Sequence, residues 1–344
     1  MAVGVGLLTY VPFRVTPEST FWADLDPAFG TWHFPNARFR HRSSCFDNVY
    51  ESNSYGARDV ERTRDSLAAR PVIVLGDSFA EGYGVARNER VTELLEASTG
   101  IEHLNFGTAG SFGSVQEWMQ YRSLAKQFAH SDVAILILPD NDFSDNDPRG
   151  KSPRRYRPYL VPAEQGLQLH YTVSFEDRDR DTLGPKKILK NRLNNASYLF
   201  NVVRHISRGW KQQLRGSREA TDRVSYDDYS EQDLQILLES YRRILVEMGA
   251  ERRLWLYTVP RHREFTQSQS KGDVFRLPRD LESFANSDPR VFYHDLLPEM
   301  LAISEREQIP WTSLFLPCDG HWSPRGHSVA AQIIQAYAYP PVPR

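Results

Sequence analysis

The chain contains 344 residues, which is long enough for one large domain with an insertion or for two smaller domains. Its composition, 40% hydrophobic and 25% charged, is typical of a soluble globular protein, and its formal net charge of −2 argues against a dedicated nucleic-acid binder. Two cysteines, Cys45 and Cys318, are too few for a disulfide scaffold or a cysteine-only metal site. They would form a single bridge in an exported protein, and they would equally suit two separate buried thiols.

The N-terminal segment, residues 1–13, is apolar but only about half as long as a membrane span, and it contains Pro12. Two interpretations stay open. The segment is either the trailing end of a signal anchor, which would attach the protein to a membrane in the periplasm or cell envelope, or a strand packed on the body, as in a cytoplasmic protein. Residues 14–69 carry turn signals without helical periodicity and predict an irregular, partly β region.

From residue 70 the sequence alternates between buried strands and amphipathic helices. Strands are expected at 72–76, 103–107, 132–139, 252–260, 290–296 and 311–317, and helices around 91–95 and at 115–128, 234–248 and 323–337. Residues 148–228 interrupt this pattern with a hairpin-like stretch at 159–171 and one long helix from Lys186 to about Leu214. We therefore expect an α/β domain over residues 70–344, built on a doubly wound parallel sheet with a helical insertion at about 148–228.

Polar loops follow four of the predicted strands, at residues 76–79, 105–110, 140–142 and 319–322. In a parallel sheet such loops gather at one edge, where ligands bind. A serine becomes a nucleophile only when a base removes its proton and a third group orients that base. Among the late loops only Asp319-Gly320-His321 offers both groups, so Ser78, His321 and Asp319 are predicted to act together. Without the other two residues, the position of Ser78 after a strand would fit a helix cap as well as a nucleophile.

These four loops resemble the sequence blocks of the SGNH (GDSL-type) hydrolase superfamily. The matching segments are Gly76-Asp-Ser-Phe79, residues 105–110 (NFGTAG), Asn141-Asp142 and the terminal Asp/His loop. The resemblance implies a three-layer α/β/α flavodoxin-like fold and serine esterase chemistry without a metal or an organic cofactor. It further implies that Ser78 is the nucleophile, His321 the general base and Asp319 the acid that orients it. The oxyanion hole would comprise the backbone N–H groups of Ser78 and Gly110 and the side-chain amide of Asn141.

The chain departs from the family pattern at two places. The asparagine block usually begins with glycine, whereas Pro139 and Asp140 precede Asn141 here, and Asp140 adds negative charge near the site. The terminal block is usually Asp-x-x-His, but Trp322 stands at that histidine position and the spacing is Asp-x-His. The shorter spacing resembles members that acetylate or deacetylate bacterial polysaccharides. His327 is the other candidate base, although its surroundings predict the opening turn of the last helix.

Other binding chemistries fit the sequence less well. The acidic run from Asp140 to Asp147 lacks the glycine and glutamate of an EF-hand loop, so no metal is expected. The glycine spacings match neither a dinucleotide fingerprint nor a phosphate-binding loop, and Ala80 replaces the second glycine of an α/β-hydrolase elbow.

The expected helix in the insertion is basic. Between Lys186 and Arg218 the chain carries nine Lys and Arg residues and no Asp or Glu. This stretch is either a basic amphipathic surface for a membrane or an anionic polymer, or a helix packed on the body with a solvated basic face. Its position between two motif blocks would also suit a lid or a wall of the substrate site.

The sequence thus predicts a serine-dependent O-acyl ester hydrolase that removes short acyl groups, such as acetyl, from a carbohydrate or a related ester. An O-acetyltransferase acting on a cell-envelope or extracellular polysaccharide would use the same residues. A non-catalytic glycan-binding module is the alternative from another class. The expected partner is a small-molecule or polysaccharide acyl ester, without nucleic acid.

Overall fold

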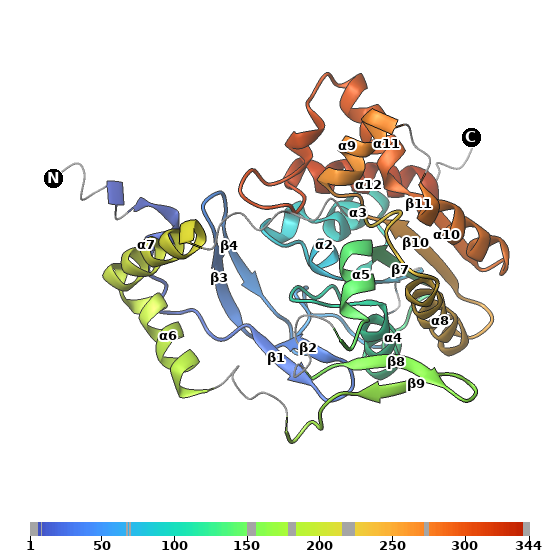
Figure 1. Cartoon of the computed structure of the whole chain (residues 1–344), viewed down its shortest axis with the longest axis horizontal. Helices are drawn as coiled ribbons and strands as arrows, with labels where there is room; N and C mark the ends of the chain where they lie inside the picture. The colour runs from blue at the N-terminus through green and yellow to red at the C-terminus, as the bar shows by residue number, and fades with distance from the viewer. Residues whose placement is uncertain are drawn as a thin grey trace.

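The computed structural model describes residues 6–7, 9–66, 68, 70–149, 156–177, 184–214, 224–271 and 275–339. Its centre is a five-stranded parallel sheet with the strand order β11-β10-β7-β5-β6 (Figure 1). The strands are β5 (Val72–Gly76), β6 (His103–Asn105), β7 (Asp132–Ile137), β10 (Arg253–Thr258) and β11 (Val291–Asp295). If these five strands are numbered 1 to 5 in chain order and the sheet is read from β6 to β11, the strand order is 2-1-3-4-5, which is that of a flavodoxin-like sheet. The doubly wound α/β fold expected from the sequence is therefore confirmed.

The apolar runs of the sequence form the central strands because those strands are covered on both faces. Every residue of β5 and β7 is buried, as expected for inner strands of a parallel sheet. The register pairs Gly76 with Leu136 and Ile137 with Thr258. β5, β7 and β10 consequently end almost level with one another, and the segments that follow them start from the same edge.

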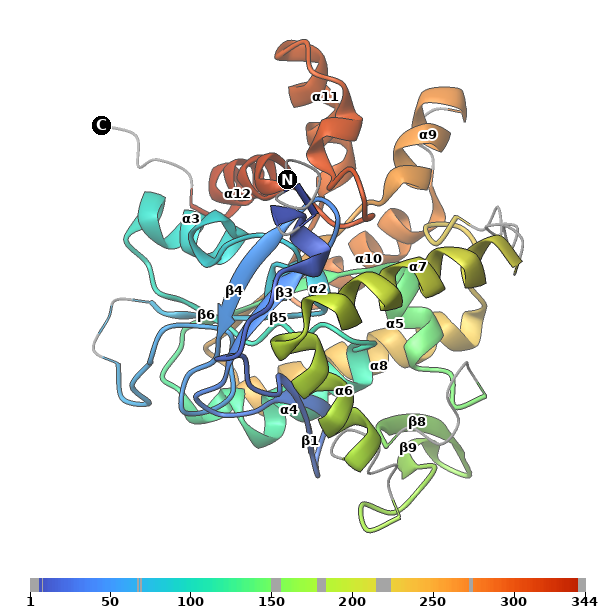
Figure 2. The same cartoon turned by 90° about the vertical axis from the view of Figure 1, so that its left-hand side faces the viewer.

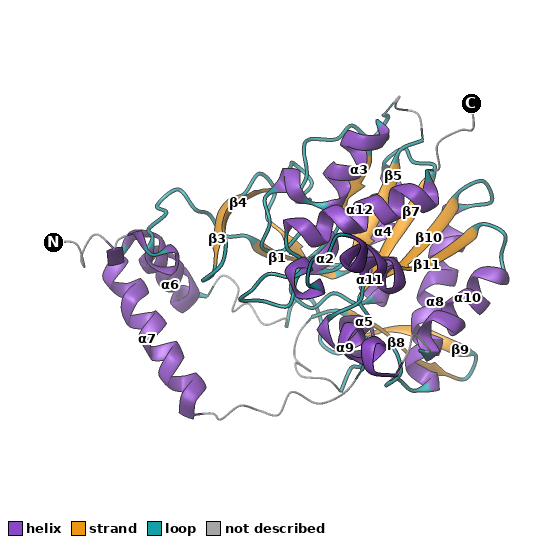
Figure 3. Cartoon of the chain, turned by 90° about the horizontal axis from the view of Figure 1, so that it is seen from above, coloured by secondary structure: helices purple, strands orange, loops and turns teal. Residues whose placement is uncertain are grey.

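Helices cover both faces of the sheet (Figures 1 and 3). On one face α3 (Val91–Thr99) contacts α12 (Pro324–Ala338), and on the other α4 (Ser114–Ser123) contacts α8 (Glu231–Met248). Further helices of this domain are α2 (Ser78–Glu81), α5 (Pro139–Asp145), α9 (His262–Lys271), α10 (Arg276–Asn286) and α11 (Leu296–Arg306). This is the three-layer arrangement that the family resemblance implied.

The N-terminal region and the insertion pack on one another beside this domain. The N-terminal region forms the antiparallel pairs β1 (Ala23–Asp26) with β2 (Gly30–His33) and β3 (Arg38–Arg42) with β4 (Asp47–Glu51). The insertion supplies the hairpin of β8 (Pro158–Ala163) and β9 (Gly166–Tyr171), as expected, and the helices α6 (Pro185–Ala196) and α7 (Tyr198–Leu214). Figure 2 views the molecule from the side of α6 and α7, which lie next to β3. The backbone N–H of Thr16 donates to the carbonyl of Asn195 at 2.7 Å, which ties the two parts together.

One predicted strand is wrong. Residues 311–317 do not join the sheet, because Trp311–Leu314 is a 3-10 helix and Phe315 makes only an isolated bridge with Trp322. Prolines at 310 and 317 flank the run, and a proline cannot donate to a sheet ladder. The apolar residues Leu314, Phe315 and Leu316 are nevertheless buried, so the run indicated burial rather than a strand.

Several predicted boundaries also differ. The single helix expected from Lys186 to about Leu214 is broken at Ser197, which is extended and separates α6 from α7. Residues 140–142 lie in the first turn of α5 rather than in a loop, because Pro139 is the first residue of a helix there. The helix expected at 115–128 ends at Ser123, and a 3-10 helix follows it.

The N-terminal segment does not form the alternative strand over its described part, since Val11–Phe13 is a 3-10 helix. Residues 1–5 and 8, and residues 215–218 at the end of the expected basic helix, lie outside the described residues. Over the part of the chain that the structure describes, no helix combines the length and the apolar character needed to cross a membrane.

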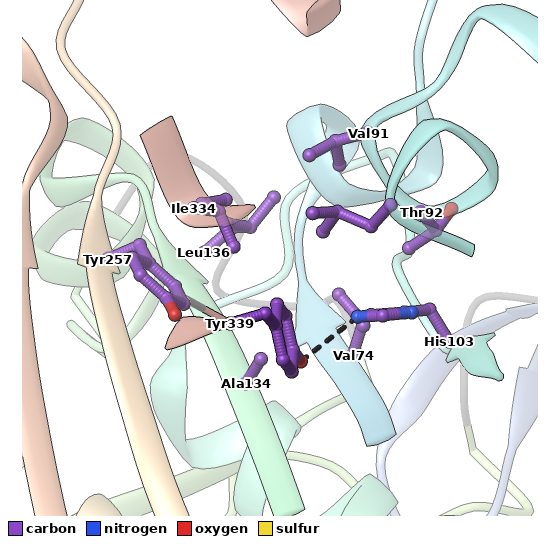
Figure 4. A pocket seen from close by; sticks show the side chains of 10 residues that line it. Val74, Val91, Thr92, His103, Ala134, Leu136, Tyr257, Ile334 and Tyr339 are labelled. Carbon is purple, nitrogen blue, oxygen red and sulfur yellow. Dashed lines mark hydrogen bonds between the residues drawn. The ribbon is translucent and has the colours of Figure 1, made fainter. Parts of the chain in front are cut away.

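A small apolar cavity lies between the sheet, α3 and α12 (Figure 4). Its volume is about 10 Å³, and its wall includes Val74, Leu136 and Ile334. At its edge His103 Nε2 and the Tyr339 hydroxyl form a hydrogen bond of 3.1 Å. A space of this size holds at most about one water molecule, so the cavity is a packing gap and no substrate site.

The two cysteines are joined in a disulfide across 273 positions of the sequence, with their Cα atoms 5.7 Å apart. The sequence left this pairing open. Cys45 lies between β3 and β4, and Cys318 directly precedes Asp319. The bridge therefore fastens the N-terminal region to the loop that carries the predicted acid and base.

We expect replacement of both cysteines by serine to lower the free energy of unfolding by about 2–5 kcal/mol, because the bridge closes a very long loop in the unfolded chain. Urea denaturation without reductant measures the difference. A reducing agent should destabilise the wild type by a similar amount and leave the double variant unchanged. Equal stabilities of the two proteins would contradict the expected contribution.

Candidate active site

Three of the sequence-predicted residues form a continuous hydrogen-bonded chain. Ser78 Oγ lies 2.7 Å from His321 Nε2, and His321 Nδ1 is hydrogen-bonded to Asp319 Oδ1. The backbone N–H of His321 also donates to Asp319 Oδ1, at 3.2 Å. Because a carboxylate can only accept, the ring must donate its Nδ1–H to Asp319, which leaves Nε2 free to accept from the serine. The Asp-x-His spacing therefore produces the same contacts that a longer spacing would.

The electrostatics of Asp319 favour its charged form. Partial burial opposes ionisation, but the hydrogen bonds from His321 and the nearby positive charges outweigh this and hold the pKa of Asp319 below its usual value. A charged carboxylate at this position would stabilise an imidazolium on His321.

Two aromatic rings hold the imidazole of His321, and sequence reasoning missed both. The ring of Tyr83 stacks on it with the centroids 4.2 Å apart, and the ring of Phe79 lies 5.0 Å away. Both residues belong to the segment that follows Ser78, so the turn that carries Ser78 also fixes the orientation of the His321 ring. The backbone N–H of Leu316 donates to the carbonyl of His321 at 2.8 Å. This hydrogen bond joins the two ends of the loop that carries Asp319 and His321.

Ser78 is the first residue of α2 and follows β5 directly. Gly76 has φ +143°, and a Cβ there would lie 2.8 Å from that of Ala80, so the tight turn requires glycine. Asp77 caps α2 by accepting from the backbone N–H of Phe79 at 3.0 Å. The predicted capping role in this turn thus falls to Asp77, and the hydroxyl of Ser78 is directed to His321.

Asn141 faces the nucleophile's turn, but its partner was not predicted. Its side-chain amide donates to Asp77 Oδ2 at 2.6 Å. Because β5 and β7 end level, the first turn of α5 meets the first turn of α2 at this point. Asp77 therefore both caps α2 and fixes the amide plane of Asn141. The sequence signal for this contact is the Gly76-Asp77-Ser78 triplet together with Asn141, because both directly follow predicted strands that end at the same edge of the sheet.

Gly110 lies in the loop that follows β6, with φ +107°. The preceding residue, Ala109, donates its backbone N–H to the carboxylate of Glu81 on α2. Glu81 is fully buried, and His33 Nε2 of β2 lies 3.5 Å from its Oε2. Burial alone would raise the pKa of Glu81, but His33, Arg58 and the Ala109 N–H lower it to about 2. A permanent charge on α2 thus holds the Gly110 loop against the turn of the nucleophile.

Arg261 offsets the negative charge that the sequence placed near the site. Its guanidinium Nη1 lies 3.1 Å from Asp140 Oδ2, and the hydroxyl of Ser225 donates to the other oxygen of Asp140. The same guanidinium lies against Gly320, where a Cβ would come within 2.7 Å of Nη2. Arg261 therefore contacts both the asparagine helix and the Asp319–His321 loop.

Two further carboxyls, Glu117 and Asp142, are buried near Asp77. Burial and their mutual repulsion raise the pKa of each well above its usual value. Burial therefore favours the neutral form of both carboxyls.

His327 is not part of the hydrogen-bonded chain. It lies fully buried on α12, as the sequence predicted for the opening turn of the last helix, and its ring packs against Trp322. Burial lowers its pKa to about 3. His321 is the histidine in contact with Ser78.

Metal ligands are not gathered in this region. Over the residues that the structure describes, no three His, Cys, Asp or Glu side chains are arranged to hold a metal ion.

We expect the stability of the wild type to fall relative to that of Asp77→Asn as the pH rises from about 4 to about 6. Burial raises the pKa of Asp77 to about 6, although the Phe79 N–H and His321 favour its charged form. The folded state therefore holds the proton more tightly than the unfolded chain, and ionisation costs on the order of 1–3 kcal/mol. Urea denaturation of both proteins across this pH range measures the difference. Parallel stability profiles would show that Asp77 keeps an ordinary pKa.

Comparison with known proteins yields structural matches only. No family model and no curated protein matches the chain. Three similar solved structures are a member of the lipolytic G-D-S-L family from Veillonella parvula, a carbohydrate esterase family 2 enzyme from Corynascus thermopiles (Myceliophthora fergusii), and the catalytic domain of peptidoglycan O-acetyltransferase A from Streptococcus pneumoniae.

The first has 12% identity, covers 79% of this chain and 100% of its own, and has a TM-score of 0.41. The second has 11% identity, covers 91% of this chain and 74% of its own, and has a TM-score of 0.42. The third has 10% identity, covers 78% of this chain and 92% of its own, and has a TM-score of 0.33. The matched proteins are of the kinds that the sequence resembles, but at these identities and scores we base the function on the geometry of this chain.

Proposed function

We propose that this chain is a serine-dependent O-acyl ester hydrolase that removes a short acyl group from a carbohydrate ester. The observation that supports the proposal is the hydrogen-bonded chain from Ser78 through His321 to Asp319. Its members come from two segments more than 240 positions apart, and the distance from Ser78 Oγ to His321 Nε2 is within the range needed for proton transfer.

In the first half of the reaction His321 takes the hydroxyl proton of Ser78, and the serine oxygen attacks the ester carbonyl. The carbonyl electron pair moves to oxygen and forms a tetrahedral oxyanion. When that intermediate collapses, the bond to the alcohol breaks and His321 gives the proton to the leaving alcohol. Asp319 keeps the imidazole in the reactive tautomer and stabilises its charged form. In the second half His321 deprotonates water, which attacks the acyl-serine and releases the acid and free Ser78.

The oxyanion would be bound by three donors. The N–H of Ser78 stands at a helix start, where backbone N–H groups have no partner within the helix. Gly110 would contribute a second backbone N–H. Asn141 would contribute the amide hydrogen that it does not donate to Asp77, since a side-chain amide carries two N–H bonds. Fixed donors of this kind stabilise the transition state more than the ground state.

Transfer of the acyl group to a sugar hydroxyl is the related reaction of the same site. The Asp-x-His spacing, which resembles that of polysaccharide-modifying members, favours a carbohydrate as one of the substrates. Hydrolysis and transfer differ only in whether water or a sugar hydroxyl attacks the acyl-serine.

We expect Ser78→Ala to lower kcat for p-nitrophenyl acetate by about 10⁴-fold or more, because the covalent step is lost. Ser98→Ala, on the exposed side of α3, is the matched control and should retain wild-type activity. An organophosphonate probe followed by intact mass should label the wild type and the control but not Ser78→Ala. Equal activity in all three proteins, or no labelling of any, would refute the nucleophile and favour a binding module. Addition of acceptor sugars to the assay then separates transfer, which produces acylated sugar, from hydrolysis.

Asn141→Ala should lower kcat by about 10²–10³-fold with little change in KM, since the lost amide contributes mainly in the transition state. Steady-state kinetics measure the split. Asn141→Asp keeps the size of the side chain but removes the N–H donor, so it should be no more active than Asn141→Ala. A change confined to KM would assign Asn141 to substrate binding alone.

A further inference from the structure

Helix α7 presents four large apolar side chains to solvent. Leu199, Val203, Ile206 and Trp210, which we call the α7 stripe, are 69%, 56%, 52% and 69% exposed. Their spacing of three and four positions puts them on one helix face, since each residue turns the helix by about 100°. A contiguous apolar stripe of this kind in water marks an interaction surface.

The stripe points away from the rest of the molecule. Asn201, about half a turn from the stripe, is buried and donates to the carbonyl of Asn194 at 2.8 Å and to that of Phe13 at 3.3 Å. Beyond Arg204 every described side chain of α7 is exposed. Figures 1 and 3 accordingly show α6 and α7 at one end of the molecule, apart from the central sheet.

The N-terminal segment packs against α7 on the side that carries His205 and Asn201. The ring of Tyr10 lies 5.9 Å and that of Phe13 lies 5.3 Å from the ring of His205. Leu7 and Tyr10 are themselves 44% and 41% exposed. Two segments nearly 200 positions apart in the sequence thus pack together, and each also exposes apolar groups.

The same two helices carry positive charge that no carboxylate neutralises. Lys186, Lys187, Lys190, Arg192, Arg204 and Arg208 are the cations of α6 and α7 whose surroundings are described. None of them forms an ion pair with a described Asp or Glu, and Arg204 instead donates to the side chain of Asn194. Repulsion from Arg204 and Arg208 lowers the pKa of Lys190, as expected in a field without nearby anions. The surface therefore favours an anionic partner.

We propose that α6 and α7 dock on the surface of an anionic lipid bilayer. The α7 stripe enters the boundary between headgroups and acyl chains, and the cations of α6 and α7 contact the anionic headgroups. An interfacial helix combines an apolar face with a basic, acid-free polar face, and a tryptophan is favoured at that depth. A soluble anionic polymer would use the cations but leave the stripe in water. A second copy of the chain would bring two unneutralised basic surfaces together.

Sedimentation with large unilamellar vesicles tests the proposal on the full chain. The probes are vesicles of phosphatidylcholine alone and of phosphatidylcholine with phosphatidylglycerol. We expect the wild type to sediment with the anionic vesicles, with binding weakened by added salt and little binding to the neutral vesicles. The double variant Val203→Gln/Trp210→Gln, and separately Lys187→Glu/Lys190→Glu, should each partition at least about tenfold more weakly.

Val246→Gln is the matched control, because Val246 is 81% exposed on α8, remote from this surface, and its replacement should leave partitioning unchanged. Far-UV circular dichroism and the melting temperature establish that each variant is folded. A wild type that stays in the supernatant with anionic vesicles overturns the proposal, as does a stripe variant that binds like the wild type. Binding to soluble polygalacturonate without binding to vesicles, or a concentration-dependent dimer that the stripe variant abolishes, would assign the surface to a polymer or to a second copy instead.

Discussion

The position of the His321 ring is the constraint on which the site depends. The ring must offer Nε2 to Ser78 while Nδ1–H is held by Asp319, and four separate contacts serve that end. Tyr83 and Phe79 support the ring from the nucleophile's side. Leu316 closes the loop, and the Cys45–Cys318 bridge fastens the residue next to Asp319 to the N-terminal region. An imidazole carried by a short loop would otherwise lose the geometry through loop motion, since the backbone of a loop is restrained by few contacts of its own.

The distribution of charge around Ser78 follows from the same requirement. In the reaction we propose, negative charge develops on the carbonyl oxygen, and neighbouring carboxylates that are neutral or paired oppose it least. Burial and the repulsion of nearby carboxyls raise the pKa of Glu117 and Asp142, while Arg261 pairs with Asp140. Two further buried carboxyls have hydrogen-bond donors of their own. Asp77 accepts from the Phe79 N–H and the Asn141 amide, and the partners of Glu81 lie on β2 and in the Gly110 loop. The acidic residues near position 140 are therefore compatible with a reaction in which negative charge develops on the carbonyl oxygen of the substrate.

Local pattern was sufficient to predict the sheet and the three residues of the hydrogen-bonded chain. Uninterrupted apolar runs predict buried parallel strands, and polar loops after such strands meet at one edge whatever their distance in the sequence. The apolar run at 311–317 was wrongly predicted to be a strand, because a buried segment outside the sheet has the same apolar pattern as a buried strand. Only the prolines at 310 and 317 indicated that the run does not pair in a sheet. The sequence indicated Asp77 and Asn141 but not their contact, which depends on where α2 and α5 start relative to one another. The stacking of Tyr83 on His321 depends on how the loop that carries His321 packs on the segment after Ser78. The disulfide likewise requires knowledge of which hairpin reaches the acid loop.

The N-terminal region connects the two surfaces to which we assign activity and membrane contact. Its β3–β4 hairpin holds the acid loop through Cys45 and the insertion through Arg42, whose guanidinium donates to the carbonyl of Asn194 at 3.3 Å. Thr16 adds a backbone and a side-chain hydrogen bond to Asn195. Hydrogen bonds from α6 to the N-terminal region, and the disulfide from that region to Cys318, connect the proposed membrane-binding helices to the loop that carries His321. The N-terminal region, residues 14–69, thus contacts both the loop that carries His321 and the helices of the insertion, and it holds them in position relative to each other.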